Sequence, residues 1–469
     1  MTMTQEEMAQ LSREELIELV LAEHAQLEVL QATIEQLKAD NEALKMKLEK
    51  GKKPPTNSSN SSQPPSRDQK PNAPKDRRKR RHGPPHGHAK HEREFVAEPE
   101  HVVEVRPQVC EECRGDLSKE SGSLVDVNQI TELPEAKAEV IEVRQYEVKC
   151  PCCGEKQTVE PPAGLEMERT FGARFEGTVV YYRQEQHMSY VRTKAALCDL
   201  HGVKISQGGI DKIMQRAGRQ AGQQVDLIQN EIQQSKVVHS DETGSRVDGQ
   251  NWWQWVFCCT VAVLHVIRSN RSADVIKDVM AGHSVDVWVS DLYSAQMKSP
   301  ARQRQLCLAH QLRNLQAVVD CYPASFWPQA MQAMFRSAIH SYNDRDQLSP
   351  PEYQAQVQRI EHICDRLLER KLEHPEAKRL MKRYRKYRDC LFVFLHRTDV
   401  GPTNNVSERN LRPAVVHRKV MGCFRSSWGA RAYAALASVI ATAALKGTSS
   451  FDAIQNLFGT PSLPIPIGV

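Results

Sequence analysis

Carboxylates at the ends of apolar segments are the residues of this chain best suited to chemistry. Asp241 follows the segment Val237–Ser240, and Asp291 follows the alternating segment Ser284–Ser290. An ionised Asp in an apolar setting is costly unless a partner compensates, and a metal ion is one such partner. An Asp at a strand end also commonly caps a turn, so Asp241 alone leaves both interpretations open.

Two Cys-x-x-Cys pairs offer a second kind of chemistry. Cys110 and Cys113 form the first pair, and Cys150 and Cys153 form the second, after a spacer of 36 residues. Four thiolates can close a tetrahedral Zn²⁺ site, because each short turn directs two sulfur atoms to one point. Cys152 is a spare thiol that could replace a neighbour. The spacer exceeds the usual zinc-ribbon length, so chance clustering of Cys is the alternative.

The third candidate group is cationic. Between Arg67 and Arg93, ten Lys or Arg residues accompany three acidic residues, although the whole chain has a net charge of only +5. The densest part of this segment comprises Arg77, Arg78, Lys79, Arg80 and Arg81. Such a run favours contact with nucleic-acid phosphates without base readout, and a solvated spacer is the alternative.

Length and composition limit the class of protein. A chain of 469 residues is expected to form two to four domains. The chain has no run of about 18 apolar residues, and its first residues are acidic and polar, so we expect neither a membrane span nor a secretory signal. Thirteen Cys, an odd number, argue against a disulfide framework and favour a reducing cytoplasm.

Residues 236–310 are expected to form the first part of an α/β core. Three antiparallel strands, a helix and two further strands follow one another, which is the strand order of a ribonuclease-H-like core. The expected strands are Val237–Asp241, Trp252–Val261, Leu264–Ser269, Ser284–Asp291 and Gln305–Leu308, with a turn at Gly244–Gly249 and a helix at Ser272–Ala281. The first and fourth strands are neighbours in that topology, so Asp241 and Asp291 can converge.

Two segments without a globular pattern open the chain. Residues 1–50 are expected to form a coiled-coil dimerisation helix, and residues 51–93 a disordered basic linker rich in Pro, Ser and Asn. The heptad seam comprises Leu27, Leu30, Ile34, Leu37, Asn41, Leu44 and Leu48. An Asn at one core position favours a parallel two-stranded coil, and a helix packed on the chain's own body is the alternative.

The next two segments connect the linker to the core. Residues 94–165 are expected to form a small β-rich zinc-binding module, with strands at Val125–Leu133 and Glu139–Lys149. Residues 166–235 are expected to be helical. Within them Arg192–His201 and Ser206–Arg219 resemble a DNA-binding helix–turn–helix, although a plain helical hairpin fits equally well.

The C-terminal third alternates between helical and core-like sequence. Residues 311–400 are expected to be a helical insertion, and residues 401–447 the second part of the core. The Ala-rich segment Ala430–Leu445 is expected to be a long helix that packs on that core. Residues 448–469 are expected to be a C-terminal tail.

Several separate motifs resemble one known family. They are DET followed by Trp residues at Asp241–Trp255, SDLYSA at Ser290–Ala295, LCLAHQLRNL at Leu306–Leu315, NNVSERNLRP at Asn404–Pro413 and NSSNSSQPPS at Asn57–Ser66. In this order, and together with the four Cys, they resemble the TnpC-type transposase of the insertion-sequence sixty-six family. The resemblance runs from roughly residue 20 to residue 450 and is highly specific because the motifs are independent.

The resemblance implies a DDE transposase on a ribonuclease-H-like fold. It assigns Asp241, Asp291 and Glu408 as the three acids, and the 117-residue separation of the last two accommodates a helical insertion. Two Mg²⁺ or Mn²⁺ ions held by these carboxylates would support strand cleavage and strand transfer. The four Cys match the zinc-binding module of the family, which implies a structural Zn²⁺ ion.

Cations near the third acid are candidates for DNA contacts. Arg412 lies on the same helical face as Glu408, so an intrahelical salt bridge and a phosphate contact are both open. Arg418, Lys419 and Arg425 are stronger phosphate candidates, because no acid lies between them.

Other polar residues near the acids are expected to have structural roles. Asn405 is expected to cap the helix that carries Glu408. Cys307 and His310 are too few for a metal site and are expected to support the core. His239 is expected to be a packed neighbour of Asp241 and not a general base.

These observations lead to a set of expected partners. We expect double-stranded DNA, both transposon ends and target, and a homodimer or higher oligomer through the coiled coil. The resemblance suggests small accessory proteins of the same element and a place at the bacterial nucleoid in the cytoplasm. A non-catalytic DNA-binding protein with a decayed core, and a different ribonuclease-H-fold nuclease such as a resolvase, are the alternative functions.

Overall fold

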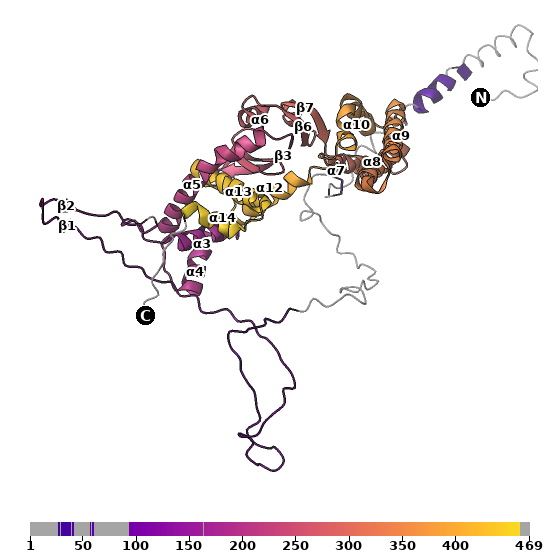
Figure 1. Ribbon diagram of the computed structural model, residues 1–469. Helices are drawn as coiled ribbons and strands as arrows, with labels where there is room; N and C mark the ends of the chain where they lie inside the picture. The colour runs from indigo at the N-terminus through magenta and orange to yellow at the C-terminus, as the bar shows by residue number, and fades with distance from the viewer. Residues whose placement is uncertain are drawn as a thin grey trace, which may run out of the picture. The chain divides into compact units, whose positions relative to one another are not determined.

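The computed structural model describes residues 27–28, 30–38, 40–41, 57, 59–60, 93–162 and 164–459 (Figure 1). Leu44, Leu48, the basic run Arg77–Arg81 and the end of the expected C-terminal tail lie outside the described residues. The chain divides into two compact units, and each is described by itself. One comprises residues 1–69, 142–194 and 205–469, and the other comprises residues 70–141 and 195–204.

A five-stranded sheet forms the centre of the larger unit. Its strands are β3 (Val237–Val247), β4 (Gln250–Cys258), β5 (Val263–Arg268), β6 (Val285–Ser290) and β7 (Ala301–Leu306), with α6 (Ala273–Met280) between β5 and β6. The order in the sheet is β5-β4-β3-β6-β7. The first three strands pair antiparallel, and β6 and β7 run parallel to β3. The predicted pairing of the first and fourth strands is therefore confirmed.

The first strand is longer than the sequence suggests. We expected β3 to end at Asp241 and a turn to span Gly244–Gly249, but β3 continues to Val247. Asp248 and Gly249 alone make the turn, with φ of 49° and 73°. Positive φ at both central positions is typical of the hairpin turn whose twist matches its strands, and Asp-Gly favours it. The expectation that the strand ended at Asp241 was wrong because this two-residue turn was not recognised.

Two long helices cover the sheet. α5 (Gln207–Gln233) and α13 (Ser427–Leu445) pack on each other and on β5. Gly218 of α5 allows the close approach, because a Cβ atom there would lie 2.5 Å from the Cβ atom of Ala432. The predicted Ala-rich helix is confirmed in α13. By length and composition this helix could cross a membrane, but half of it is buried within the protein.

Hydroxyl groups of α13 complete the hydrogen bonding of the edge strand β5. The backbone N–H of His265 donates to Ser438 Oγ at 2.8 Å, and that of Val263 donates to Thr442 Oγ1 at 3.0 Å. Thr442 Oγ1 donates in turn to the carbonyl of Val263 at 3.1 Å. A buried backbone group without a partner is destabilising. These two side chains supply hydrogen-bond partners that a neighbouring strand would otherwise supply to β5.

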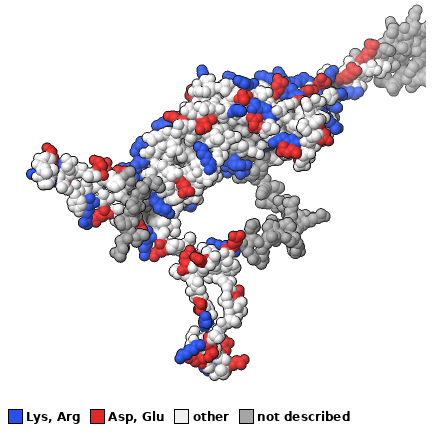
Figure 2. Space-filling model, in the orientation of Figure 1, with Lys and Arg blue, Asp and Glu red and all other residues white. Residues whose placement is uncertain are grey.

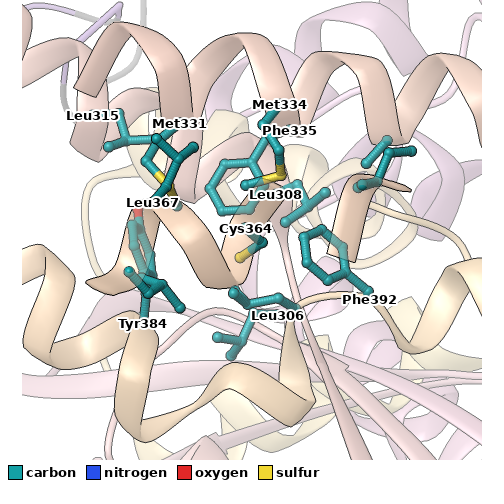
Figure 3. Packing of buried hydrophobic residues seen from close by; sticks show 14 of the residues in the cluster. Leu306, Leu308, Leu315, Met331, Met334, Phe335, Cys364, Leu367, Tyr384 and Phe392 are labelled. Atoms are coloured by element: carbon teal, nitrogen blue, oxygen red, sulfur yellow. The ribbon is translucent and has the colours of Figure 1, made fainter. Parts of the chain in front are cut away.

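The expected helical insertion is helical throughout its length. Its elements are α7 (Leu308–Cys321), α8 (Phe326–Asn343), α9 (Pro350–Glu369), α10 (Pro375–Lys386) and α11 (Val393–His396), with short 3₁₀ turns at Arg345–Gln347 and Arg388–Cys390. Figure 3 shows Met331, Phe335, Cys364 and Tyr384 packed together, with Leu306 of β7 beside them. The insertion therefore shares one apolar core with the β6–β7 side of the sheet.

Helices before the sheet follow the predicted pattern in part. They are α3 (Ala173–Gln184), α4 (Tyr190–His201) and α5. Gly202 has φ of 69°, and the Ser206 hydroxyl accepts the Gly209 N–H at the start of α5, as predicted. α5 extends to Gln233, well beyond the expected end at Arg219, and buries Ile213, Ala217 and Ala221. A helix that is so much a part of the core is typical of a structural hairpin, which leaves the helix–turn–helix interpretation a prediction.

The two Cys-x-x-Cys segments adopt matching turns. The Cys110 N–H donates to the Gly115 carbonyl, and the Arg114 N–H donates back to Cys110. The Cys150 N–H donates to Glu155, and the Gly154 N–H donates back to Cys150. Residues between the pairs do not form the expected long strands. Among the residues described from 94 to 162, the only strands are β1 (Val148–Lys149), before the second pair, and β2 (Lys156–Gln157), after it. The apolar side chains from Leu124 to Val140 are exposed, with no core to cover them.

The described part of the N-terminal segment is helical from residue 27 to residue 41. The apolar positions of the expected seam are exposed in this single chain, namely Leu27, Leu30, Ile34 and Leu37. The remaining helices are α12 (Asn405–Met421) and α14 (Ser450–Gln455), followed by a 3₁₀ turn at Asn456–Phe458.

Removing the two hydroxyl groups on β5 should weaken the core. Ser438→Ala and Thr442→Val each leave one buried backbone N–H without its acceptor, which costs about 1–3 kcal/mol. Urea unfolding followed by tryptophan fluorescence measures the loss. Ser427→Ala, at an exposed position of the same helix, is the control and should have little effect. Equal midpoints for all three variants would contradict the role given to α13.

Candidate catalytic carboxylate site

Asp241 and Asp291 lie side by side because of the strand register. His239 of β3 is paired with Val289 of β6, and each Asp follows its member of that pair by two residues. Side chains two residues apart on a strand share one face. The two carboxylates therefore leave the same edge of the sheet, with Asp241 inside β3 and Asp291 directly after β6.

Each aspartate is fixed by one backbone hydrogen bond. Asp241 Oδ1 accepts the N–H of Glu242 at 2.9 Å, and Asp291 Oδ1 accepts the N–H of Tyr293 at 2.8 Å. These bonds orient the carboxylates and leave each with a second oxygen for a ligand.

Glu408 enters the site from the first turn of α12. Its Oε1 atom lies 3.5 Å from Arg313 Nη2 and 3.6 Å from His310 Nδ1, both on α7. Neither separation is a hydrogen bond, and Oε1 is buried without a hydrogen-bond partner among the described residues. A buried acceptor in that state is suited to a ligand that the protein itself does not supply.

Asp241 is buried and lies within reach of the charges of the other acids. The pKa of Asp241 is raised well above its usual value, chiefly because the side chain is buried. The negative charges of Glu242, Asp291 and Glu408 raise it further, and the Glu242 N–H opposes them. A cation bound among these groups would relieve both the burial cost and the repulsion.

A buried asparagine joins the segments that carry the acids. Asn404 is fully buried, and its Nδ2 atom donates to the carbonyl of Ser240, the residue before Asp241, at 2.8 Å. Its backbone N–H donates to Cys307 Sγ at 3.2 Å. The Cys307 N–H donates in turn to the carbonyl of Ser290, the residue before Asp291, at 2.8 Å. Asn404 also accepts the Ser407 hydroxyl, one residue before Glu408.

Asn404, and not Asn405, therefore occupies the N-cap position that precedes the first residue of α12. Asn405 is exposed and is the first residue of the helix, so the expected capping role of Asn405 was wrong. Sequence reasoning missed the importance of Asn404 because its partner, the Ser240 carbonyl, lies 164 residues away. The two adjacent Asn residues predict a helix cap, but the sequence does not indicate which of the two is buried.

Glu242 is committed to structure although it is adjacent to Asp241. One carboxylate oxygen accepts two bonds from Arg271 at 3.0 and 2.6 Å, and the other accepts Gln296 Nε2 at 2.7 Å. Its side chain is only 1% exposed. Both oxygens are thus occupied by the protein.

Burial lowers the pKa of both histidines near the acids. Burial lowers the pKa of His239 to about 4, which agrees with its expected role as a packed neighbour. Burial, with the positive charge of Arg313, lowers the pKa of His310, while Glu408 and Asp291 oppose this shift.

Cys307, His310 and Glu408 bring three potential ligand atoms within 4.8 Å of one another. The expected count of two ligands was too low, because Glu408 approaches from another element. Burial raises the pKa of Cys307 to about 11, and its sulfur already accepts the Asn404 N–H. The contacts therefore suit a supporting group for the third acid.

The predicted cations lie in different surroundings. Arg412, Lys419 and Arg425 are exposed. No ion pair between Arg412 and Glu408 occurs among the described residues, because Glu408 turns towards α7. The Arg418 guanidinium donates to the Gly244 carbonyl and Thr243 Oγ1 of β3. Arg313, three positions after His310, is a cation at the site that sequence reasoning missed.

Comparison with known proteins identifies the family to which the chain belongs. The site belongs to an α/β protein in which a buried carboxylate group is completed by a helix beyond a helical insertion. A family model described as the IS66 family of transposases matches residues 169–432, more than half of the chain. The chain therefore belongs to the IS66 transposase family. No curated protein matches it.

Asp241→Asn should stabilise the metal-free protein at about pH 8 and have no effect near pH 3. Because the pKa of Asp241 is raised in the folded chain, folding loses stability as pH rises from the unfolded value of about 3.9 through the folded value. Asn imitates the protonated form and avoids this loss. Urea unfolding at both pH values measures the difference.

Asp286→Asn is the matched control. Asp286 lies at the start of β6, and Asp291 directly follows the end of that strand. This variant should show no such pH-dependent gain, because Asp286 is paired with Arg302 and Arg397. An equal gain for Asp241→Asn at both pH values would contradict the electrostatic explanation.

Proposed function

We propose that this transposase family member is a DDE enzyme with Asp241, Asp291 and Glu408 as its catalytic acids, on a ribonuclease-H-like core. The strand order β5-β4-β3-β6-β7 is the order expected for that fold. The observation that carries the proposal is the strand register that brings Asp241 and Asp291 to one edge of the sheet. The charges of Asp291 and Glu408 also raise the pKa of Asp241, in addition to the larger effect of burial.

The residues of the site fit divalent magnesium or manganese. Carboxylate oxygens are the ligands that Mg²⁺ prefers, and both aspartates keep an oxygen available. Glu408 Oε1, which has no hydrogen-bond partner among the described residues, would be a third carboxylate ligand. Two bound Mg²⁺ ions would activate a nucleophile at neutral pH and neutralise charge on the leaving oxygen.

The proposed reaction has two steps at one site. In the first, water attacks a phosphodiester at a transposon end, and the broken P–O bond frees a 3′-OH. In the second, that 3′-OH attacks a phosphodiester of target DNA and displaces another 3′ oxygen. The carboxylates would hold the divalent ions that the reacting phosphate requires in both steps, and Arg313 and His310 restrain Glu408 from the α7 side.

DNA would be held by exposed cations around this site. Arg412, Lys419 and Arg425 on and after α12 remain candidates, with Arg77–Arg81 of the linker. Arg418 is a weaker candidate because it is bonded to β3. Figure 2 shows Lys and Arg over the helical insertion as well, with acidic residues among them. There α10 exposes Lys378, Arg379, Lys382, Arg385 and Lys386.

The remaining parts of the chain would assemble and brace the enzyme. We propose a structural Zn²⁺ site at Cys110, Cys113, Cys150 and Cys153. The matching turns support Cys153 over Cys152, since it occupies the position of Cys113. Backbone N–H groups of the turns lower the pKa of Cys110 and of Cys150, which favours thiolates. Residues 1–50 would form a homodimer through the exposed seam, and the accessory proteins remain part of the proposal.

A strand-transfer assay tests the triad. Asp241→Asn, Asp291→Asn and Glu408→Gln should each lower joining by at least about 100-fold, because a metal contributes several kcal/mol to the transition state. The substrate is the inverted repeat that flanks the gene, and Asp286→Asn is the control. Undiminished joining by the Asp241 variant would overturn the catalytic proposal and favour a non-catalytic DNA-binding role.

Native mass spectrometry tests the zinc site. We expect one Zn²⁺ per chain in the unmodified protein and none after Cys110→Ser or Cys150→Ser, since a structural site needs all four ligands. Cys152→Ser is the matched control and should keep the ion. A zinc-free protein with all four thiols open to alkylation would contradict the proposal.

A further inference from the structure

A short polar turn in the N-terminal arm has an ordered hydrogen-bond pattern of its own. Asn57 Oδ1 accepts the backbone N–H groups of Ser59 and Asn60 at 2.8 and 3.2 Å. Asn60 Oδ1 accepts the N–H of Asn57 at 2.8 Å. The two Asn side chains thus close the turn reciprocally, which is the role that Asn performs best in turns.

The turn contacts the C-terminal end of α7. Asn60 is only 6% exposed, and its Nδ2 atom donates to Asp320 Oδ2 at 2.9 Å. The other oxygen of Asp320 accepts Gln316 Nε2 at 2.7 Å, and Gln316 Oε1 accepts Gln332 Nε2 of α8 at 3.0 Å. Side chains of α7 and α8 therefore hold Asp320 in place independently of its contact with Asn60. A fixed, charged acceptor makes the contact specific.

We propose that the Asn57–Asn60 turn is an anchor that docks the N-terminal arm on α7 of the same chain. Its consequence for DNA, which rests on the proposed function, is that the length of chain after the anchor limits how far the basic run Arg77–Arg81 can lie from α7. DNA bound by that run would be kept within this distance of the helix that carries His310 and Arg313.

Distances along the chain support this role. Asp320 lies ten residues after His310 on α7, which corresponds to about 15 Å from the side chains next to Glu408. Arg77 follows Asn60 by seventeen residues, so the basic run can be at most about 60 Å from the anchor. Without the anchor, the run would be restrained on this side only by the coiled-coil segment.

The surface next to the anchor is also suited to DNA. Tyr322, just after α7, donates its hydroxyl to Glu376 Oε2 of α10 at 2.8 Å, and its ring stacks on His374 at 3.9 Å. The C-terminal end of α7, where the anchor docks, is thus connected to α10, which exposes five Lys or Arg residues as candidates for contacts with DNA.

Hydrogen exchange of the full chain without DNA tests the docking. Asn60→Asp places a second carboxylate against Asp320, so exchange in a peptide covering residues 55–66 should accelerate by about tenfold or more. Combining Asn60→Asp with Asp320→Asn should restore slow exchange, since the new amide can donate to the new carboxylate. Asn72→Asp is the control. Unchanged exchange in Asn60→Asp, or no restoration in the pair, would overturn the anchor.

Binding to a linear duplex with a transposon end tests the consequence. Asn60→Asp should weaken binding by about three- to tenfold through lost effective concentration, and the paired variant should recover it. Equal affinity in all variants would overturn the tethering role. Failure of the catalytic proposal would show differently, as undiminished joining by Asp241→Asn with the exchange results intact.

Discussion

The site depends on a chain of hydrogen bonds that runs through Asn404. This side chain holds the Ser240 carbonyl, its backbone N–H reaches Cys307, and the Cys307 N–H holds the Ser290 carbonyl. The bonds connect β3, the end of β6 and the start of α12 through residues adjacent to the acids. All three groups are buried, so loss of any one bond would leave an unpaired polar group in a low-dielectric setting. Carboxylates that repel one another are kept together by neutral groups.

The acid that is destabilised by burial and the acid that makes structural hydrogen bonds are different residues of the same strand. Asp241 lies where burial and like charges disfavour its ionised form, and the described side chains offer it no cation. Glu242, one residue later, is buried as well but is fully paired with Arg271 and Gln296. Burial raises the pKa of both acids, but among the described side chains only Glu242 has cationic and amide partners. The unpaired acid is the one expected where function requires an unsatisfied group.

Sequence patterns predicted what local periodicity determines. The strand order, α13 and the helical insertion followed from alternation, Ala content and helical composition. Glu408 could be assigned only by resemblance, because no local pattern distinguishes it from other helical acids. The extension of β3 beyond Asp241, the choice between Asn404 and Asn405, and the approach of Arg313 all depend on partners far away in the chain. The strands expected near Val125 and Glu139 do not form. Alternating apolar side chains stabilise a strand only when a core covers one of its faces, and these side chains are exposed.

The hydroxyl groups of α13 have a consequence for assembly. An edge strand with open N–H and C=O groups can accept a strand from another molecule. Ser438 and Thr442 use those groups on β5. At the other edge, the 3₁₀ turn Arg388–Cys390 and α11 lie against β7, and the Gln305 side chain bonds to the Leu391 carbonyl and the Phe394 N–H. Sheet extension between copies is thereby discouraged at both ends. The pairing of copies proposed above would therefore have to use the exposed helical seam instead of the sheet.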